Sequence, residues 1–208
     1  MRSNGSTRIT DSFPTDAELL SRARSGDHAA FRLLVNRYEP IVASTVQGML
    51  GRGSEAEDVG QETFIRFYHA LDSFREDSTL KTYLTRIAIN LSLNELKRRK
   101  KKQVRFTGIE TLEERDFATS GNRVIDENER KHLVRKAIDR LDPKHKAVVV
   151  LRMLNGYSTK ETADLLNLPQ GTVLSRLSRG MKSLEQLLKP YIANDEKTGT
   201  TSATSFAL

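Results

Sequence analysis

Residues 158–188, STKETADLLNLPQGTVLSRLSRGMKSLEQLL, decide the fold of the C-terminal part of this chain. Ser158 with Glu161 three residues later forms a capping box, which predicts that a helix begins directly after the serine. That helix is predicted to be short, because Asn167 tolerates the left-handed conformation and Pro169 disfavours a helical residue before it. The pattern therefore predicts two helices joined by a tight turn.

The helix after this turn has two chemically different faces. Hydroxyl and cationic side chains on one face suit contact with base edges and phosphates in the major groove of duplex DNA. An apolar stripe on the other face would dock the helix on its own domain. An ordinary amphipathic helix with solvated charges fits the same pattern, so the residues alone leave both interpretations open. The stripe is Val173, Leu177, Met181, Leu184 and Leu188, and the polar face carries Ser175, Arg176, Ser178, Arg179 and Lys182.

The composition limits the class of protein. The 208 residues suffice for one domain or two small ones. Lys and Arg number 34 against 27 Asp and Glu, and the resulting charge of +7 is compatible with a polyanionic partner, a membrane surface or simple solubility. The absence of cysteine excludes disulfides, thiol nucleophiles and thiolate metal sites. No stretch has the length and apolarity of a membrane span or signal peptide, so we expect a soluble, cytoplasmic chain.

The N-terminal part of the chain is predicted to be helical throughout. Polar residues up to about Thr15 suggest a disordered lead, after which Asp16 can cap a first helix. A glycine breaks that helix, and Asp27 can cap a second one with apolar residues at helical spacing as far as Tyr38. A third apolar segment covers residues 41–50, and no segment alternates in the period-two manner of a strand.

The predicted helix 54–71 combines an apolar stripe with an acidic row. The row consists of Glu55, Asp58 and Glu62, with Arg66 further along. A solvated charged face is the commoner origin of such a row, and a docking face for a basic or mixed partner surface is the alternative. The apolar stripe is Ala56, Val59, Thr63, Phe64, Phe67 and Leu71.

A polar loop at residues 72–78 and a long basic helix follow. This helix begins near Leu80 and ends in the run KRRKKK at residues 97–102, which is denser than helix capping requires. Aromatic rings beside cations hold unstacked bases along a phosphate backbone. For Tyr83 a core position with its hydroxyl at the surface stays open as the alternative. The side chains concerned are Phe74, Arg75, Lys81, Tyr83, Arg86, Asn90, Asn94, Lys97 and Lys101.

A linker and a second domain complete the chain. Periodicity fails over residues 103–127, where acidic residues gather, and we interpret this stretch as a flexible linker. A second helical domain starts near Asn128. The Asp-Pro pair at residues 142–143 predicts a helix restart, and the Asn-Gly pair at residues 155–156 predicts a helix end. Because the tail beyond Pro190 is polar, we expect it to be disordered.

Four blocks of sequence stand in a recognisable order. They read DAELLSRARSGDHAAFRLLVNRY, AEDVGQETFIRFYHALDSF, TYLTRIAINLSLNELKRR and LRMLNGYSTKETADLLNLPQGTVLSRLSRG. From about Asp16 to Leu188 the chain thereby resembles the sigma-70 family of bacterial RNA polymerase sigma factors, in particular the small extracytoplasmic-function (ECF) group. Each block alone is weak, but four in order across two domains are highly specific.

The resemblance implies an all-α fold with two small helical domains, the sigma region 2 bundle and the sigma region 4 helix-turn-helix, joined by a flexible linker. The implied function is to bind core RNA polymerase, recognise the minus-35 and minus-10 promoter elements and promote promoter melting and transcription initiation. The divisions would be a disordered lead (1–15), region 2 (16–103), a linker (104–127), region 4 (128–192) and a disordered tail (193–208).

The family's functional residues carry over onto matching positions. Docking on the clamp helices of the largest polymerase subunit is implied for Asp58, Gln61, Glu62 and Phe64. Capture of the minus-10 element as a single strand is implied for Phe74, Arg75, Lys81, Tyr83, Arg86, Asn90, Asn94, Lys97 and Arg98. Asn90 and the preceding loop would form the pocket for an extruded base. Reading of the minus-35 duplex is implied for Thr172, Ser175, Arg176, Ser178, Arg179 and Lys182. The flap of the second-largest subunit and an anti-sigma factor are further implied partners.

Three positions depart from the family's pattern. Tyr83 stands where Trp is common, Leu80 where Phe is usual, and Leu174 where a basic residue is frequent. Tyr can still stack with a smaller ring, and Leu could contact a thymine methyl. These departures concern promoter preference.

Two other functions compete with this one. A polymerase-independent helix-turn-helix regulator would need neither the acidic docking face nor the single-strand surface. A nucleic-acid enzyme would need a metal-ligand cluster, a phosphate-binding Gly loop or an activated nucleophile, and the sequence shows none of these. We therefore expect no catalytic residue, no metal, no cofactor, no small-molecule substrate and no membrane insertion.

Overall fold

The computed structural model describes residues 14–107 and 126–197. Within these ranges every regular element is a helix and none is a strand, which confirms the all-α prediction. Most of the expected disordered lead and linker, and the end of the expected tail, lie outside the described residues. The helices are α1 (Asp16–Arg24), α2 (His28–Leu50), α3 (Ser54–His69), α4 (Leu80–Thr107), α5 (Glu127–Asp139), α6 (Pro143–Val149), the π-helix η1 (Val150–Leu154), α7 (Thr159–Leu166) and α8 (Gln170–Lys197).

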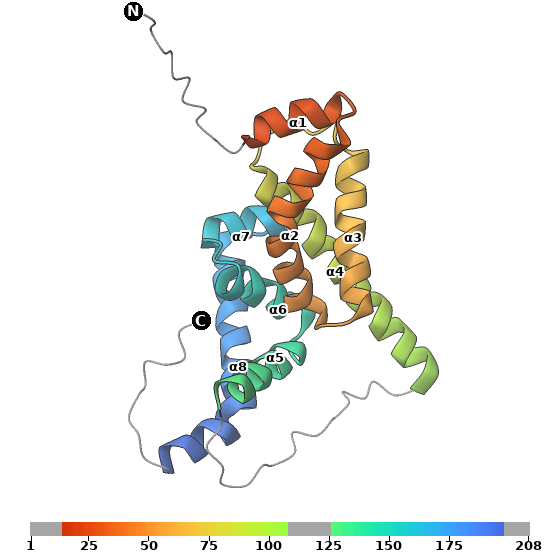
Figure 1. The fold of residues 1–208 in the computed structure, drawn as a ribbon. Coiled ribbons are helices and arrows are strands. Elements are labelled where there is room, and N and C mark those ends of the chain that lie inside the picture. The colour runs from red at the N-terminus through yellow and green to blue at the C-terminus, as the bar shows by residue number, and fades with distance from the viewer. Residues whose placement is uncertain (1–13, 108–125, 198–208) are drawn as a thin grey trace, which may run out of the picture.

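The N-terminal domain is a bundle of α2, α3 and α4, with α1 lying across one end of α2 (Figure 1). Phe67 of α3 is fully buried at its centre. Its ring lies 5.8 Å from that of Phe31 and 6.2 Å from those of Phe74 and Tyr83, measured between centroids. Burial of one such ring stabilises a fold by about 2–3 kcal/mol. The apolar stripe predicted for α3 therefore forms the centre of this domain.

The helix α2 is continuous through Pro40, whereas the sequence predicts two separate segments on either side of it. Proline lacks the N–H that would bond the carbonyl one turn earlier, and inside a helix it costs about 3 kcal/mol. Val42, Val46 and Met49 beyond the proline are almost completely buried in the same core as the first half. Their packing offsets the missing hydrogen bond, so one long helix forms.

Several helix ends differ from the sequence expectations. α4 continues to Thr107, beyond the expected boundary at residue 103. α8 continues through Pro190 to Lys197, into the stretch expected to be a disordered tail. In contrast, α3 ends at His69, before Leu71. Pro40 and Pro190 therefore lie inside helices and do not mark helix ends.

The π-helix η1 between α6 and α7 was not predicted. The amide of Asn155 donates to the carbonyl of Val150 at 3.0 Å, and the amide of Tyr157 donates to that of Leu151 at 3.0 Å. A π-turn inserts one extra residue into the helical repeat, which turns the following side chains to a new direction. Here Asn155 and Tyr157 reach Thr45 of α2 and Thr85 of α4, respectively.

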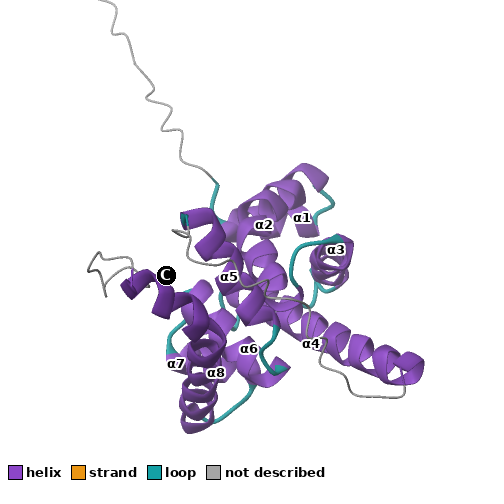
Figure 2. Ribbon diagram, turned by 90° about the horizontal axis from the view of Figure 1, so that it is seen from below, coloured by secondary structure: helices purple, strands orange, loops and turns teal. Residues whose placement is uncertain are grey.

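The two predicted domains pack directly on each other. In Figure 1 the C-terminal helices lie to one side of the N-terminal bundle, with α6 next to α2. α2 contacts η1, α5 and α6, α4 contacts α6 and α7, and buried residues from both domains form one continuous apolar cluster. Figure 2 shows that the C-terminal part of α4, which carries the basic run, projects beyond this body.

Candidate nucleic-acid interface

The turn between α7 and α8 has the predicted local structure. The Ser158 hydroxyl accepts from the Glu161 amide at 3.2 Å, and the Glu161 carboxylate accepts from the Ser158 amide at 2.7 Å. The hydrogen bonds from Ser158 hold the pKa of Glu161 below its usual value. Asn167 ends α7 in the left-handed conformation with φ +51°. The capping box and the helix stop are both confirmed.

The face of α8 that packs on its own domain differs from the predicted stripe. Val173 and Leu184 are buried as expected, but Met181 is 40% exposed and Gly180 takes its place. A Cβ atom at Gly180 would approach Cγ2 of Val149 to 2.8 Å, so only glycine lets the two helices come this close. Residues 173, 180 and 184 share one helical face, but a search for apolar side chains passes over a glycine.

The outward face of α8 carries the residues predicted to read the minus-35 duplex. Ser175, Ser178, Arg179 and Lys182 are exposed, and Thr172 and Arg176 are half-buried. Leu174 is 54% exposed, more than any other large apolar side chain in the described ranges for which exposure is given. The helix thus presents hydroxyls, cations and one uncovered aliphatic side chain together. This combination suits phosphate contacts and apolar contact with a thymine methyl.

The residues predicted to bind a single strand lie mainly along the outer face of α4. Lys81, Arg86, Asn90, Asn94, Lys97 and Arg98 are exposed on this helix, and Arg75 is exposed on the preceding loop. Tyr83 is half-buried and its ring lies 4.7 Å from that of Phe74, between centroids. Phe74 itself is only 7% exposed. The structure therefore brings the two rings together, with Phe74 packed beneath and Tyr83 nearer the surface.

Not all cations of this surface are free to meet phosphates. Arg98 forms ion pairs with Glu95 at 2.8 Å and with Glu55 at 3.8 Å. The hydrogen bond to Glu95 raises the pKa of Arg98 further. The Lys81 ammonium lies 4.9 Å from the centroid of the Tyr157 ring, and Arg86 donates to the backbone carbonyl of Asp164 at 3.3 Å. The last two contacts join the N-terminal domain to the C-terminal one.

Arg37 is a cation near this surface that the sequence analysis overlooked. It lines an open hollow of about 400 Å³ together with Tyr38, Pro40, Ile41 and Lys81. However, Arg37 is paired with Asp16 at 2.5 Å and donates to the carbonyl of Pro14 at 2.6 Å. The Arg37 guanidinium therefore holds the start of α1 against α2.

The predicted docking face lies on α3. Asp58 and Gln61 are exposed, whereas Glu62 is half-buried and pairs with Arg66 at 2.8 Å. Phe64 is half-buried and packs against the apolar core. Ile65, which the sequence analysis missed, is 49% exposed and lies four residues after Gln61 and seven after Asp58, on the same face. The exposed face of α3 thus combines acidic, amide and aliphatic groups.

Other kinds of site are not apparent in the described ranges. Residues 14–107 and 126–197 contain no group of three or more His, Cys, Asp or Glu that could hold a metal ion. Among these same residues, no helix has the length and apolarity needed to cross a membrane. The candidate surfaces in the described ranges are the exposed faces of α3, α4 and α8.

Comparisons with known proteins agree with this architecture. A family model described as Sigma-70 region 2 matches residues 34–102, and one described as Sigma-70 region 4 matches residues 131–184. The chain is similar to the ECF RNA polymerase sigma-E factor of Escherichia coli strain K12, with 35% identity over 187 residues that cover 86% of this chain and 96% of the relative. It is 33% identical over 186 residues to the sigma-E factor of Haemophilus influenzae, covering 86% of this chain and 97% of that relative.

Two solved structures share the fold. The sigma factor RpoE in complex with the anti-sigma factor NepR from Bartonella quintana has a TM-score of 0.60 at 23% identity, covering 76% of this chain and 96% of that one. CnrH in complex with the cytosolic domain of CnrY also has a TM-score of 0.60, at 26% identity, covering 82% of this chain and 95% of that one.

Proposed function

Because this chain belongs to the sigma-70 family of RNA polymerase sigma factors, in its extracytoplasmic-function group, we propose a separate task for each of its three exposed helix faces. The chain is a sigma factor for transcription initiation. α3 binds core RNA polymerase, α4 captures the minus-10 element as a single strand, and α8 reads the minus-35 duplex. The observation that supports this division is that the three faces lie on different helices and differ in chemistry.

The proposed polymerase contacts are Asp58, Gln61, Glu62 and Phe64, to which we add Ile65 because it is exposed on the same face. The partner is the clamp of the largest subunit, and the C-terminal domain contacts the flap of the second-largest subunit. Phe64 is packed against the core, so it contributes by supporting the exposed contact residues of α3. An interface of this kind joins charge complementarity, which steers association, to an apolar contact that slows dissociation.

The proposed minus-10 contacts follow the outer face of α4. Tyr83 stacks on a base and is held in place by Phe74. Lys97 meets a phosphate directly, whereas Lys81, Arg86 and Arg98 exchange their present protein contacts for phosphates when the strand binds. Asn90 contributes to the pocket for an extruded base, and Arg75 and Asn94 contribute further polar contacts. Each base taken from the stack costs a few kcal/mol, and stacking on an aromatic ring returns about 1–3 kcal/mol. Melting therefore draws on several contacts together.

The proposed minus-35 contacts are Thr172, Ser175, Arg176, Ser178, Arg179 and Lys182 on α8. Leu174, at the same surface, adds an apolar contact with a thymine methyl. In this scheme the protein carries out no catalysis, needs no cofactor and works where core polymerase does, in the cytoplasm. Because the solved complex of RpoE contains an anti-sigma factor, we include such a factor among its partners.

The division of tasks can be tested with full-length protein, core RNA polymerase and a promoter library with random upstream sequence. We expect transcripts from a subset of promoters that share two elements. Asp58→Lys should weaken binding to core polymerase at least about tenfold, because like charges brought together at an interface cost several kcal/mol. Its affinity for a minus-35 duplex selected from the library should not change.

Asp72→Lys is the matched control for this variant. It makes the same charge change on an exposed residue of the turn after α3, outside the residues proposed to contact polymerase. We expect polymerase affinity within about twofold of the wild type, since surface charges away from an interface contribute little. If Asp58→Lys lowered polymerase affinity and duplex affinity equally, the division of tasks would be wrong.

A further inference from the structure

Arg24, the last residue of α1, bonds to three points of the loop before α4 (residues 70–79). Its Nε atom donates to the carbonyl of Leu71 at 3.1 Å, and its Nη2 atom donates to the carbonyl of Phe74 at 2.6 Å. Its Nη1 atom pairs with the Glu76 carboxylate at 3.1 Å. These acceptors lie 47 to 52 positions further along the chain. Because a guanidinium holds its donors in a fixed plane, the three bonds specify where the loop lies relative to α1.

The helix α1 is a firm base for these bonds. Leu19 and Leu20 are 0% and 2% exposed in the core of the N-terminal domain. The capping box of Thr15 and Glu18 fixes the first turn of the helix. At the other end, the Arg24 side chain is only 30% exposed, and hydrogen bonds from a charged donor are stronger than those between neutral groups. The guanidinium is therefore held at one place beside the loop.

The backbone of the loop needs such support at Glu76. This residue has φ +60°, in the left-handed region. For a residue other than glycine that conformation costs free energy and persists only where the surroundings hold it. Arg24 bonds to Glu76 and to Phe74, and Arg75 lies between them with an exposed side chain. The two anchors thus hold the backbone on both sides of Arg75.

Phe74 passes the same constraint to Tyr83. Its carbonyl accepts from Arg24, while its ring lies 6.2 Å from that of Phe67 and 4.7 Å from that of Tyr83, measured between centroids. Phe74 is 7% exposed, so backbone and ring are both fixed. A change at Arg24 therefore reaches two proposed DNA contacts, Arg75 through the backbone and Tyr83 through the ring of Phe74.

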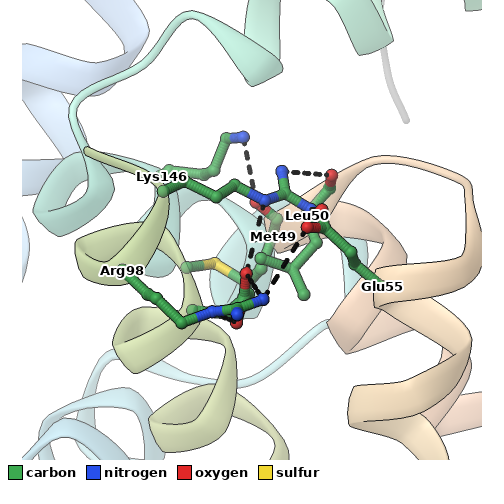
Figure 3. A network of polar contacts seen from close by, with 7 residues as sticks. Met49, Leu50, Glu55, Arg98 and Lys146 are labelled. Atoms are coloured by element: carbon green, nitrogen blue, oxygen red, sulfur yellow. Dashed lines mark hydrogen bonds and ion pairs between the residues drawn. The ribbon is translucent and has the colours of Figure 1, made fainter. Parts of the chain in front are cut away.

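The connection between α2 and α3, at the other end of the bundle, is held differently. Arg99 donates to the carbonyl of Leu50 at 3.1 Å and pairs with Glu55 at 2.5 Å. Lys146, which is only 3% exposed, donates to the carbonyl of Met49 at 3.0 Å. Figure 3 shows the Lys146 side chain directed at Met49, near Leu50 and Glu55. Two cations thus share that connection, whereas one guanidinium serves three acceptors in the loop before α4.

We propose that Arg24 is a positioning residue for the pocket that receives the extruded base. It sets base preference by holding the loop in the shape in which Arg75 and Asn90 surround that base. Arg24 contacts no DNA in this scheme. Discrimination between bases depends on exact placement of polar groups, and a loop already held in the bound shape loses less entropy on binding. The inference rests on the function proposed for this loop and α4.

Promoter selection with the full-length chain and core RNA polymerase tests the proposal. In a library randomised over the minus-10 element, Arg75→Ala and Asn90→Ala identify the positions that the pocket reads. At these positions Arg24→Gln should lower the ratio between the preferred base and the next at least about fivefold, the loss typical of one misplaced base contact. A loss of stability alone would lower transcripts from all promoters equally and leave this ratio unchanged.

Arg22→Gln is the matched control. Arg22 lies on the same helix, but its guanidinium bonds to Asp27 in the turn between α1 and α2, at 2.8 and 2.9 Å. Its base ratios should equal those of the wild type. In both variants minus-35 preference and affinity for core polymerase should stay within about twofold of the wild type, because distant sites act independently. A selective loss of base preference in Arg22→Gln as well would overturn the assignment to Arg24.

Two further variants separate geometry from charge and from folding of α1. Arg24→Lys keeps the charge, but an ammonium cannot replace a planar group with three bonds, so it should behave like Arg24→Gln. Wild-type ratios in Arg24→Lys would show that charge alone suffices, which overturns the proposal. Glu76→Gly removes one bond from the side of the loop and suits a positive φ. It should change preference at the same positions even if Arg24→Gln does not fold.

Limited digestion of the free chain with trypsin tests the anchoring without DNA. Cleavage after Arg75 requires the loop to leave its place, and cleavage after Arg52, exposed in the turn before α3, is the internal reference. Arg24→Gln should speed the first relative to the second at least about fivefold, because local opening limits proteolysis, and Arg22→Gln should not. An unchanged rate in Arg24→Gln would overturn the proposal.

Failure of this inference differs from failure of the proposed function. If the wild type gave no promoter-directed transcript with core polymerase, the proposed function would fail and this inference with it. If the wild type selected promoters but Arg24→Gln and Glu76→Gly kept its base ratios, only the inference about Arg24 would fail.

Discussion

The hydroxyl pair of Thr85 and Tyr157 offers a measure of how strongly the two domains hold each other. Tyr157→Phe removes one hydroxyl and leaves that of Thr85 buried without this partner, and Thr85→Val does the reverse. Leaving one buried hydroxyl unsatisfied costs about 1–3 kcal/mol, whereas removing both partners together is nearly neutral. Since the bond joins the domains, each single substitution should shift the equilibrium from packed toward separated domains about 5- to 150-fold.

A double-mutant cycle isolates this bond from other effects of the substitutions. The readout is the acetylation rate of Lys146 in the free full-length chain, because its side chain is accessible only when the interface opens. Both single variants should be labelled faster than the wild type, and the double variant should be slower than either. Urea unfolding followed by circular dichroism should show the same order of stability.

Additive effects would refute the reasoning. If the double variant opened as the product of the two single effects, the coupling energy would be zero and the two hydroxyls would not meet. Unchanged labelling in both single variants would show that the bond does not hold the domains together. Either result would also remove a main support for the direct packing of the two domains.

Two further predictions concern the helices themselves. Gly180→Ala should lower the free energy of unfolding of the C-terminal domain by about 1–3 kcal/mol, because the new methyl group overpacks against Val149. Gly60→Ala in α3, where a Cβ meets nothing within 4 Å, should raise the free energy of unfolding by about 0.5–1 kcal/mol. Urea unfolding measures both changes. The amide of Ala30 and the guanidinium of Arg22 hold the pKa of Asp27 below its usual value. The ionised Asp27 carboxylate therefore stabilises the fold fully above the ordinary carboxyl pKa near 4. This stabilisation is lost as the pH falls through the lower pKa that Asp27 has in the folded protein. Thermal unfolding between pH 6 and about pH 2 should show a shallower acid loss for Asp27→Asn than for the wild type, and an equal loss would contradict this assignment.

Local signals in the sequence predicted the parts of the fold that short-range bonds control. The capping box of Ser158 and Glu161 and the left-handed Asn167 lie where they were expected, because their hydrogen bonds join residues three or four positions apart. The acidic face of α3 and the basic face of α4 were also predicted, since helical periodicity specifies which residues share a face.

Periodicity misled where the packing partner determines the outcome. The sequence predicted one helix as far as Tyr38 and a separate segment over residues 41–50, but the core on both sides of Pro40 keeps α2 continuous. Met181 fitted an apolar stripe, but the close approach of Val149 places Gly180 in the interface instead. Neither effect has a signal within the local sequence, because each depends on a helix that is distant along the chain or on a core formed by several helices.

The sequence by itself thus determined most of the helices, several of their caps, their charged faces and the resemblance to the family. Only the tertiary structure decided which of those faces are covered: Lys146 is buried against α2, and Lys81 and Arg86 meet the C-terminal domain. The physical reason is the separation along the chain between the residues that interact. A helix pattern encodes that one face will be buried but not by which element, and the bonds that close this interface join residues 72 and 110 positions apart in the chain.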